Sequence, residues 1–145
     1  MAASPQARGL RALSVLLGVF FLFQGLGKLD WLADPSPLRN QLAGFLEAAN
    51  RWNRAYLELV CIPYASLFAR LVPLGEMATG AALVTGAYAR YAAIAALLMV
   101  LNFHVAGGFI FQYAYLTNGY GFPVVGGLLA LASGGVNLPF GLTRK

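Results

Sequence analysis

The stretch Leu10–Leu29, LRALSVLLGVFFLFQGLGKL, decides the fold, because it is a long apolar run that carries only two charges, Arg11 and Lys28. An α-helix needs about 20 apolar residues to cross the roughly 30 Å hydrocarbon core of a bilayer. The rest of the 145-residue chain has the same character, since 59% of its residues are hydrophobic and 10% are charged. Soluble domains average about 45–50% apolar and about 25% charged residues. This composition excludes an ordinary cytosolic domain and a disordered chain, and it indicates an integral membrane protein.

Three more stretches are long and apolar enough to span a membrane: Tyr64–Gly86, Arg90–Phe111 and Gly121–Phe140. Turn-forming residues separate them, since Asp34–Pro37 lies in the first loop and Asn118–Gly121 in the third. The chain is therefore predicted to be one all-α domain over residues 1–145, a membrane-embedded four-helix bundle.

A signal peptide is an alternative for the first stretch, because Arg8 and Arg11 lie at the start of the apolar run Leu10–Leu26. The run is long for a signal-peptide core, and no clean A-x-A cleavage site follows it. We therefore expect a retained first span over Leu10–Leu29.

The distribution of charge predicts the orientation of the chain. Basic residues without acidic neighbours occur in the N-terminal tail, in the link between the second and third spans and in the C-terminal tail: Arg8, Arg11, Arg90, Arg144 and Lys145. Charges balance in the remaining segments, so these residues account for the whole net charge of +5. Because basic loops stay on the cytoplasmic side, both termini are expected in the cytoplasm at a bacterial-type inner membrane, with the first loop outside.

The first loop carries a helical pattern of its own over residues 38–59. Apolar residues recur there at offsets of three and four: Leu38, Leu42, Phe45, Leu46, Ala49, Trp52, Tyr56 and Leu59. Two interpretations are open, an amphipathic helix that lies in the outer interface and a helix that caps the outer end of the bundle. Both can hold together.

Small residues mark one face of the fourth span, where Gly126, Ala130 and Gly134 recur at four-residue intervals. Such spacing lets helix backbones approach closely in lipid. It predicts a packing or docking face, either inside the bundle or toward another membrane subunit or a second copy of the chain.

Several functions are excluded because particular residues are scarce or scattered. The Lys and Arg residues are spread among apolar runs, whereas nucleic-acid binding needs a clustered basic face. Cys61 is the single cysteine and His104 the single histidine. The chain alone therefore forms neither an intramolecular disulfide nor a transition-metal site. Any redox metal is expected to belong to a partner, and Cys61 is expected to be a small packing residue near the outer interface.

Polar residues inside the spans are the functional candidates, because an ionisable side chain in hydrocarbon costs about 2.5–3.5 kcal/mol on insertion scales. These residues are Gln24, Lys28, Arg70, Glu76, Asn102 and His104. At about 1.5 Å of rise per residue, all of them fall between the outer rim and about the bilayer midplane. They form either a network that fixes helix packing or a cavity open to the outer side that offers an anion or carbonyl site.

Arg70 and Glu76 lie on the same span but about 240° apart around the helix, so they cannot readily pair with each other. Each is expected to find a partner on another helix. The candidates are Lys28 or Asn102 for Glu76, and His104 or a ligand for Arg70.

Three motifs occur in order along the chain. Gly18–Leu29, GVFFLFQGLGKL, has the pattern G-x-x-F-x-x-x-G-x-x-K-L, and Leu67–Gly80, LFARLVPLGEMATG, contains G-E-x-x-x-G. Leu83–Gly86 and Arg90 form a short basic turn. In this order the motifs resemble the DoxX family, which includes the small subunit of thiosulfate:quinone oxidoreductase, over about Leu13–Asn102.

The resemblance implies a four-helix membrane bundle that belongs to an oxidoreductase system handling sulfur compounds and quinone, or to redox-stress defence. It makes Lys28 and Glu76 the family-matching polar residues and Arg70 a third. His104 has no family counterpart.

Two functional hypotheses follow. In the first, the chain is a subunit of a membrane oxidoreductase, has no cofactor of its own, and binds quinone or a small sulfur oxyanion such as thiosulfate. The proposed ligand-binding residues are Lys28, Arg70, Gln24 and Asn102, and the proposed proton-transferring residues are Glu76 and His104. In the second, the chain is a non-catalytic accessory subunit of a larger respiratory or photosynthetic-type complex, docked through the small-residue face. A transporter or channel is disfavoured, because the four short helices show no inverted repeat and few polar residues in their inner half, which leaves no evident pathway.

Overall fold

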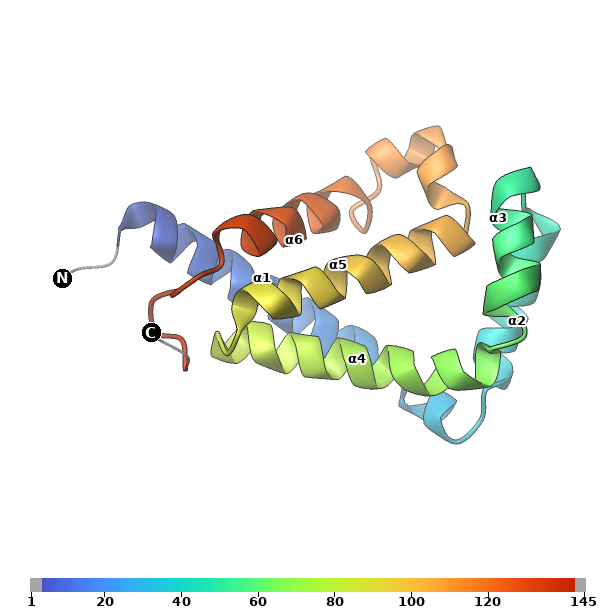
Figure 1. Ribbon diagram of the computed structural model, residues 1–145, viewed down its shortest axis with the longest axis horizontal. Coiled ribbons are helices and arrows are strands. Elements are labelled where there is room, and N and C mark those ends of the chain that lie inside the picture. Colours follow the sequence, from blue (N-terminus) through green and yellow to red (C-terminus); the bar gives the residue numbers. More distant parts are fainter. Residues whose placement is uncertain (1–3, 143–145) are drawn as a thin grey trace.

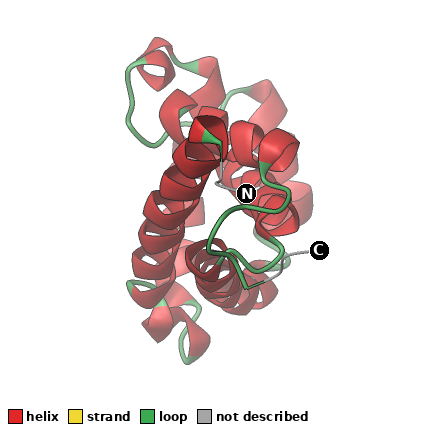
Figure 2. Cartoon of the chain, turned by 90° about the vertical axis from the view of Figure 1, so that its left-hand side faces the viewer, coloured by secondary structure: helices red, strands yellow, loops and turns green. Residues whose placement is uncertain are grey.

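A computed structural model describes residues 4–142, which form helices and connecting turns without a strand (Figures 1 and 2). The helices are α1 (Pro5–Leu26), η1 (Leu29–Leu32), α2 (Ser36–Glu47), α3 (Arg51–Tyr56), η2 (Leu57–Cys61), α4 (Ala65–Thr85), α5 (Ala89–Ala106), η3 (Phe109–Phe111), η4 (Tyr113–Leu116) and α6 (Phe122–Gly134). The predicted all-α class is confirmed.

Three of these helices, α1, α4 and α5, are long and apolar enough to cross a membrane. The fourth, α6, has 13 residues, and its length of about 20 Å is below the roughly 30 Å of a bilayer core. The predicted span Gly121–Phe140 is therefore too long. The helix stops at the glycine pair Gly134–Gly135, and the chain then turns so that the Leu142 amide donates to the Thr85 carbonyl, 3.1 Å away. The structure thus has three candidate spans and a shorter fourth helix.

Helices α1 and α4 are in backbone contact, and glycine makes this contact possible. A Cβ atom on Gly18 would lie 2.8 Å from the Gly80 carbonyl oxygen, and one on Gly80 would lie 2.7 Å from the Leu22 amide nitrogen. About two helical turns further along α1, a Cβ on Gly25 would lie 2.8 Å from the Pro73 carbonyl oxygen. Close approach through small residues was expected on the fourth span, but it occurs between the first and the second.

The predicted small-residue face of α6 has one end beside α1 and a second part that is open. A Cβ on Gly134 would lie 2.9 Å from the Leu10 side chain of α1, so Gly134, although exposed, borders α1. Gly126 and Ala130 are exposed, and no atom lies within 4 Å of a Cβ placed on Gly126. Gly127, beside this face, is the residue that packs against Leu17.

The start of α1 and the turn between α4 and α5 lie at one end of the molecule (Figure 1). There the Arg11 guanidinium donates to the carbonyls of Leu83 and Val84 at 3.0 and 2.7 Å, and the Ser14 hydroxyl donates to Leu83 at 2.7 Å. These carbonyls belong to the last turn of α4, where no intrahelical donor is available. Arg11 therefore caps α4, a role that its charge did not reveal.

The basic residues predicted to mark the cytoplasmic side are only partly described by the structure. Arg8 and Arg11 lie in α1 and Arg90 lies at the start of α5, so these three share one end. Arg144 and Lys145 lie outside the described residues.

At the opposite end, α2 and α3 lie across the bundle (Figure 1). The predicted continuous helix over residues 38–59 is wrong, because α2 ends at Glu47 and a separate helix, α3, begins at Arg51. The Asn50 side chain caps α3 by accepting hydrogen bonds from the amides of Trp52 and Asn53. The buried side chains of Leu38 and Leu42 join a core cluster with Trp31. This burial supports the interpretation that the loop helices cap the bundle.

Helix α5 ends at Ala106 and not at Phe111, because two glycines follow it. Gly108 has φ 68°, which an L side chain rarely adopts, and its open face is occupied by the Asn53 amide. That amide nitrogen donates to the Ala106 carbonyl at 3.3 Å. The glycine pair thus turns the chain back toward the bundle and brings η3 and η4 beside α5.

We predict that Gly80→Ala lowers the free energy of unfolding by about 1–3 kcal/mol, because the new Cβ would press on backbone that cannot yield. The matched change Gly126→Ala is expected to be neutral or to stabilise by up to about 1 kcal/mol through helix propensity. Denaturation of the detergent-solubilised variants, followed by far-ultraviolet circular dichroism, measures both. Equal stability of the two variants would contradict the packing argument.

Candidate ligand-binding cavity

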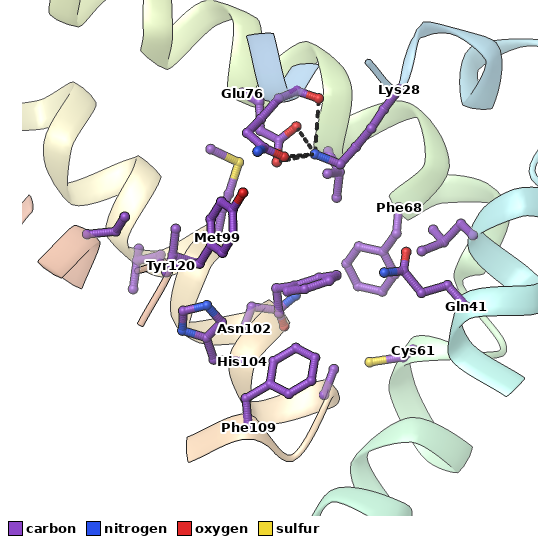
Figure 3. A pocket seen from close by; sticks show the side chains of 18 of the residues that line it. Lys28, Gln41, Cys61, Phe68, Glu76, Met99, Asn102, His104, Phe109 and Tyr120 are labelled. Carbon is purple, nitrogen blue, oxygen red and sulfur yellow. Dashed lines mark hydrogen bonds and ion pairs between the residues drawn. The ribbon is translucent and has the colours of Figure 1, made fainter. Parts of the chain in front are cut away.

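The bundle contains a mainly apolar, partly open cavity of about 730 Å³ at the end that carries α2. Helices α1, α4 and α5 form its walls, α2 covers it, and residues 109–121 line the remaining side. Figure 3 shows the Lys28–Glu76 pair on one side and His104 with Phe109 on the opposite side. Its polar lining side chains include Gln24, Lys28, Gln41, Glu76, Asn102, His104, Tyr115, Asn118 and Tyr120.

Lys28 and Glu76 form an ion pair across the contact between α1 and α4. The Lys28 ammonium lies 2.7 and 2.9 Å from the two Glu76 carboxylate oxygens, and it also donates to the carbonyl and side-chain oxygens of Gln24 at 3.0 and 3.2 Å. The two charged side chains are 18% and 14% exposed. Of the two partners expected for Glu76, the structure selects Lys28.

The position of this pair follows from the glycine contact between the helices. Gly25 lies against the backbone of Pro73 and Met77; Glu76 directly precedes Met77 on the antiparallel α4, and Lys28 follows Gly25 by three residues, just past the end of α1. The close approach therefore brings the ammonium within bonding distance of the carboxylate. The Trp31 ring, 5.9 Å from the ammonium, adds a cation–π contact.

His104 lies across the cavity and bonds to a tyrosine rather than to an arginine. Its Nδ1 lies 3.1 Å from the Tyr115 hydroxyl, and the Phe109 ring packs edge-on at a centroid distance of 6.1 Å. Burial raises the pKa of Tyr115, so this hydroxyl keeps its proton at neutral pH. A protonated tyrosine can donate to Nδ1, which leaves the proton of neutral His104 on Nε2.

Asn102 is held by the helices that cover the cavity. The Tyr56 hydroxyl of α3 donates to its Oδ1, which ties the cover to α5.

Cys61 lines the same region and is buried, and burial raises the pKa of its thiol. A thiol held in its protonated form is a poor nucleophile, so the expectation that Cys61 is a packing residue agrees with its surroundings.

Arg70 is the candidate that the structure moves away from the others. It is exposed, it does not line the cavity, and its guanidinium donates to the Ser66 carbonyl on its own helix at 2.8 Å. The expected approach to His104 is therefore wrong. Glu76 faces α1 and the cavity, so a residue about 240° away around α4 faces outward.

The cavity contains no site of clustered metal ligands. Within residues 4–142, no three His, Cys, Asp or Glu side chains gather to hold a metal ion.

A scan against protein-family models matches the DoxX family over residues 9–109. The chain belongs to the DoxX family. It is therefore an integral membrane protein in contact with the lipid bilayer. Neither the curated proteins nor the solved structures contain a significant match to it.

The DoxX match ends inside the region that completes the cavity. It includes both residues of the ion pair and His104, but not the turns after residue 109 that supply Tyr115 and Tyr120. Sequence reasoning missed these aromatic residues, together with Trp31, because their rings resemble ordinary interfacial aromatics in sequence. The glycine pair after α5 was the available signal that this segment folds back.

We predict that Glu76→Leu or Lys28→Met alone lowers the free energy of unfolding of this DoxX protein by about 3–5 kcal/mol, because either leaves one charge buried without its partner. The double variant is expected to be more stable than either single variant. The exposed pair Arg54–Glu58, with a 3.7 Å separation, supplies the control, since Glu58→Gln should change stability by at most about 1 kcal/mol. Single variants as stable as Glu58→Gln, in detergent denaturation, would contradict a structural role for the ion pair.

Proposed function

We propose that this DoxX protein binds a neutral, lipid-soluble redox molecule of the quinone class in its cavity, as a subunit of a membrane oxidoreductase system. The observation that carries the proposal is the cavity itself, because it combines about 730 Å³ of mainly apolar space with polar groups on two opposite walls. Ligand pockets of this volume typically pair an apolar surface with a few placed polar groups. A quinone has the complementary form, a flat apolar ring with a carbonyl at each end.

The charge of the cavity favours a neutral ligand over a sulfur oxyanion. Lys28 is already neutralised by both carboxylate oxygens of Glu76. Arg70, the other cation proposed to bind an anion, lies outside the cavity. An anion entering this apolar space would lose its hydration without gaining an unpaired cation, and that loss is costly in a medium of low dielectric.

The proposed binding mode places one quinone carbonyl at His104 and the other near the Lys28–Glu76 pair. Nε2 of His104 donates when Tyr115 bonds to Nδ1, while Gln24 and Asn102 line the polar walls. Reduction to the quinol takes up two electrons and two protons. In the proposal the two protons come from water and are relayed to the quinone oxygens by His104 and Glu76, and a partner subunit that oxidises a sulfur compound supplies the two electrons.

The proposal also assigns a location. The basic residues of α1 and α5 lie at the end away from the cavity. Following the positive-inside rule, we propose that this end is cytoplasmic in a bacterial-type inner membrane. The cavity then lies in the outer half of the bilayer.

Tryptophan fluorescence gives a direct test of binding. Trp31 lines the cavity and is 9% exposed, whereas Trp52 is 78% exposed and does not line it. In a Trp52→Phe background in nanodiscs, a short-tailed ubiquinone is expected to quench Trp31 in a saturable manner. We predict that His104→Phe weakens binding about tenfold, the equivalent of one hydrogen bond of about 1.4 kcal/mol.

Arg70→Ala is the matched control, because Arg70 is charged but exposed outside the cavity. It should leave the quinone affinity unchanged. Quenching that does not saturate, or that is the same in the His104→Phe variant, would overturn the binding proposal. A saturable signal from thiosulfate, with none from quinone, would instead favour the oxyanion.

A second candidate function, an accessory subunit that docks on a larger complex, is favoured by the outward half of the α6 face. Gly126 and Ala130 are exposed and leave room for another helix. We predict that Gly126→Leu reduces co-purification with partner subunits, or self-association, while the circular dichroism spectrum is retained.

Gly44→Leu is the control for this docking test, because Gly44 is equally open but lies on α2. Gly134 is unsuitable, since its Cβ position already contacts Leu10. Unchanged assembly of the Gly126→Leu variant would remove this candidate.

A further inference from the structure

We propose that the cavity opens sideways into the lipid between α4 and α5, so that its ligand is a long-tailed quinone whose tail stays among the lipid chains. This inference rests on the proposed function and narrows it from quinones in general to membrane-resident ones. It assigns Leu71 and Leu98 as the two sides of the opening.

Leu71 of α4 and Leu98 of α5 each border both the cavity and the outer surface of the molecule. Both line the cavity, and both are also exposed at the surface of the molecule, by 53% and 64%. A side chain that touches the interior space and the surroundings at once marks a rim. The pair therefore places an opening between these two helices.

The depth of this rim places it in hydrocarbon. Leu71 lies six residues, about 9 Å, below the outer end of α4, and Leu98 lies eight residues, about 12 Å, below the outer end of α5. Both helices are candidate membrane spans. The surface exposure of both leucines is therefore exposure to lipid chains and not to water.

The contact between α4 and α5 sets the inner limit of the opening. A Cβ on Gly75 would lie 2.8 Å from the Met99 sulfur, so the two helices touch there. Figure 1 shows α4 and α5 diverging from their connecting turn toward the end that carries α2 and α3. Beyond the Gly75–Met99 contact the helices separate; Leu71 lies on the diverging side, and Leu98, which directly precedes Met99, lies at the level of the contact and marks the inner edge of the opening.

Other routes into the cavity are more obstructed. Glycine contacts close the seam between α1 and α4, and the buried side chains of Leu38 and Leu42 cover the outer end. A further rim at Tyr120 is narrowed by the Phe20 ring, 5.8 Å away between centroids. A quinone head can thus reach Lys28 and His104 while an apolar tail leaves between α4 and α5.

Exchange kinetics test the opening. We compare Leu71→Phe/Leu98→Phe with the control Leu74→Phe/Leu101→Phe in the Trp52→Phe background, in nanodiscs. The control leucines lie three residues further along the same helices, are also exposed, and do not line the cavity. Dissociation of a ubiquinone with a long isoprenoid tail, followed by recovery of Trp31 fluorescence, should be about tenfold slower in the rim variant than in the control. Equal rates in the two variants would overturn the lateral opening.

A second measurement separates failure of the inference from failure of the proposed function. Without quinone, a lipid-dissolved brominated acyl chain should quench Trp31 more strongly in the control than in the rim variant. Water-soluble acrylamide should quench Trp31 weakly in both. Strong acrylamide quenching, or equal lipid quenching in both variants, would refute the opening even if quinone bound. Absence of quinone binding with the expected lipid quenching would instead refute only the quinone as occupant.

Discussion

The contact between the backbones of α1 and α4 is the constraint on which the rest of the structure depends. Gly18, Gly25 and Gly80 remove the Cβ atoms that would otherwise hold these helices apart. In lipid, packing of this kind replaces the hydrophobic effect as the force between helices. The same contact fixes the register in which Lys28 meets Glu76. Packing and polar chemistry are therefore coupled at this contact.

The ion pair explains how an apolar cavity can hold ionisable groups. Each charge alone would be expensive at this depth, but the ammonium is surrounded by oxygens from Glu76 and Gln24. The pair presents a dipole to the cavity and no net charge. His104 is satisfied differently, by the Tyr115 hydroxyl. The two polar walls thus offer groups for hydrogen bonding and proton transfer, but they carry no net positive charge that would favour an anion.

Much of the fold was predictable from composition and spacing, because long apolar runs leave few alternatives in a membrane. The family motifs singled out Lys28 and Glu76 as polar residues, and the structure joins them in an ion pair, one of the two partners that helix geometry left open for Glu76. The positions of helix ends were less predictable, since Gly107–Gly108 and Gly134–Gly135 stop helices within apolar sequence that hydropathy counts as span. Arg70 was misplaced because the helical angle showed that it faces away from Glu76 but not which of the two faces the cavity. The aromatic lining from residues 109–121 depends on a fold-back that periodicity does not reveal.

These early helix ends create the cavity. Had α5 continued to Phe111, it would have extended straight past α2, and Tyr115 could not have turned back toward His104. Because α6 begins at Phe122, the space outward of Val124 is lined by turns and not filled by a packed helix. The region is then closed by α2, which Tyr56 and Asn53 of α3 help to tie to α5. Glycine therefore acts in two opposite ways in this chain: within α1 and α4 it removes space between helices, and after α5 it creates the space in which a ligand can bind.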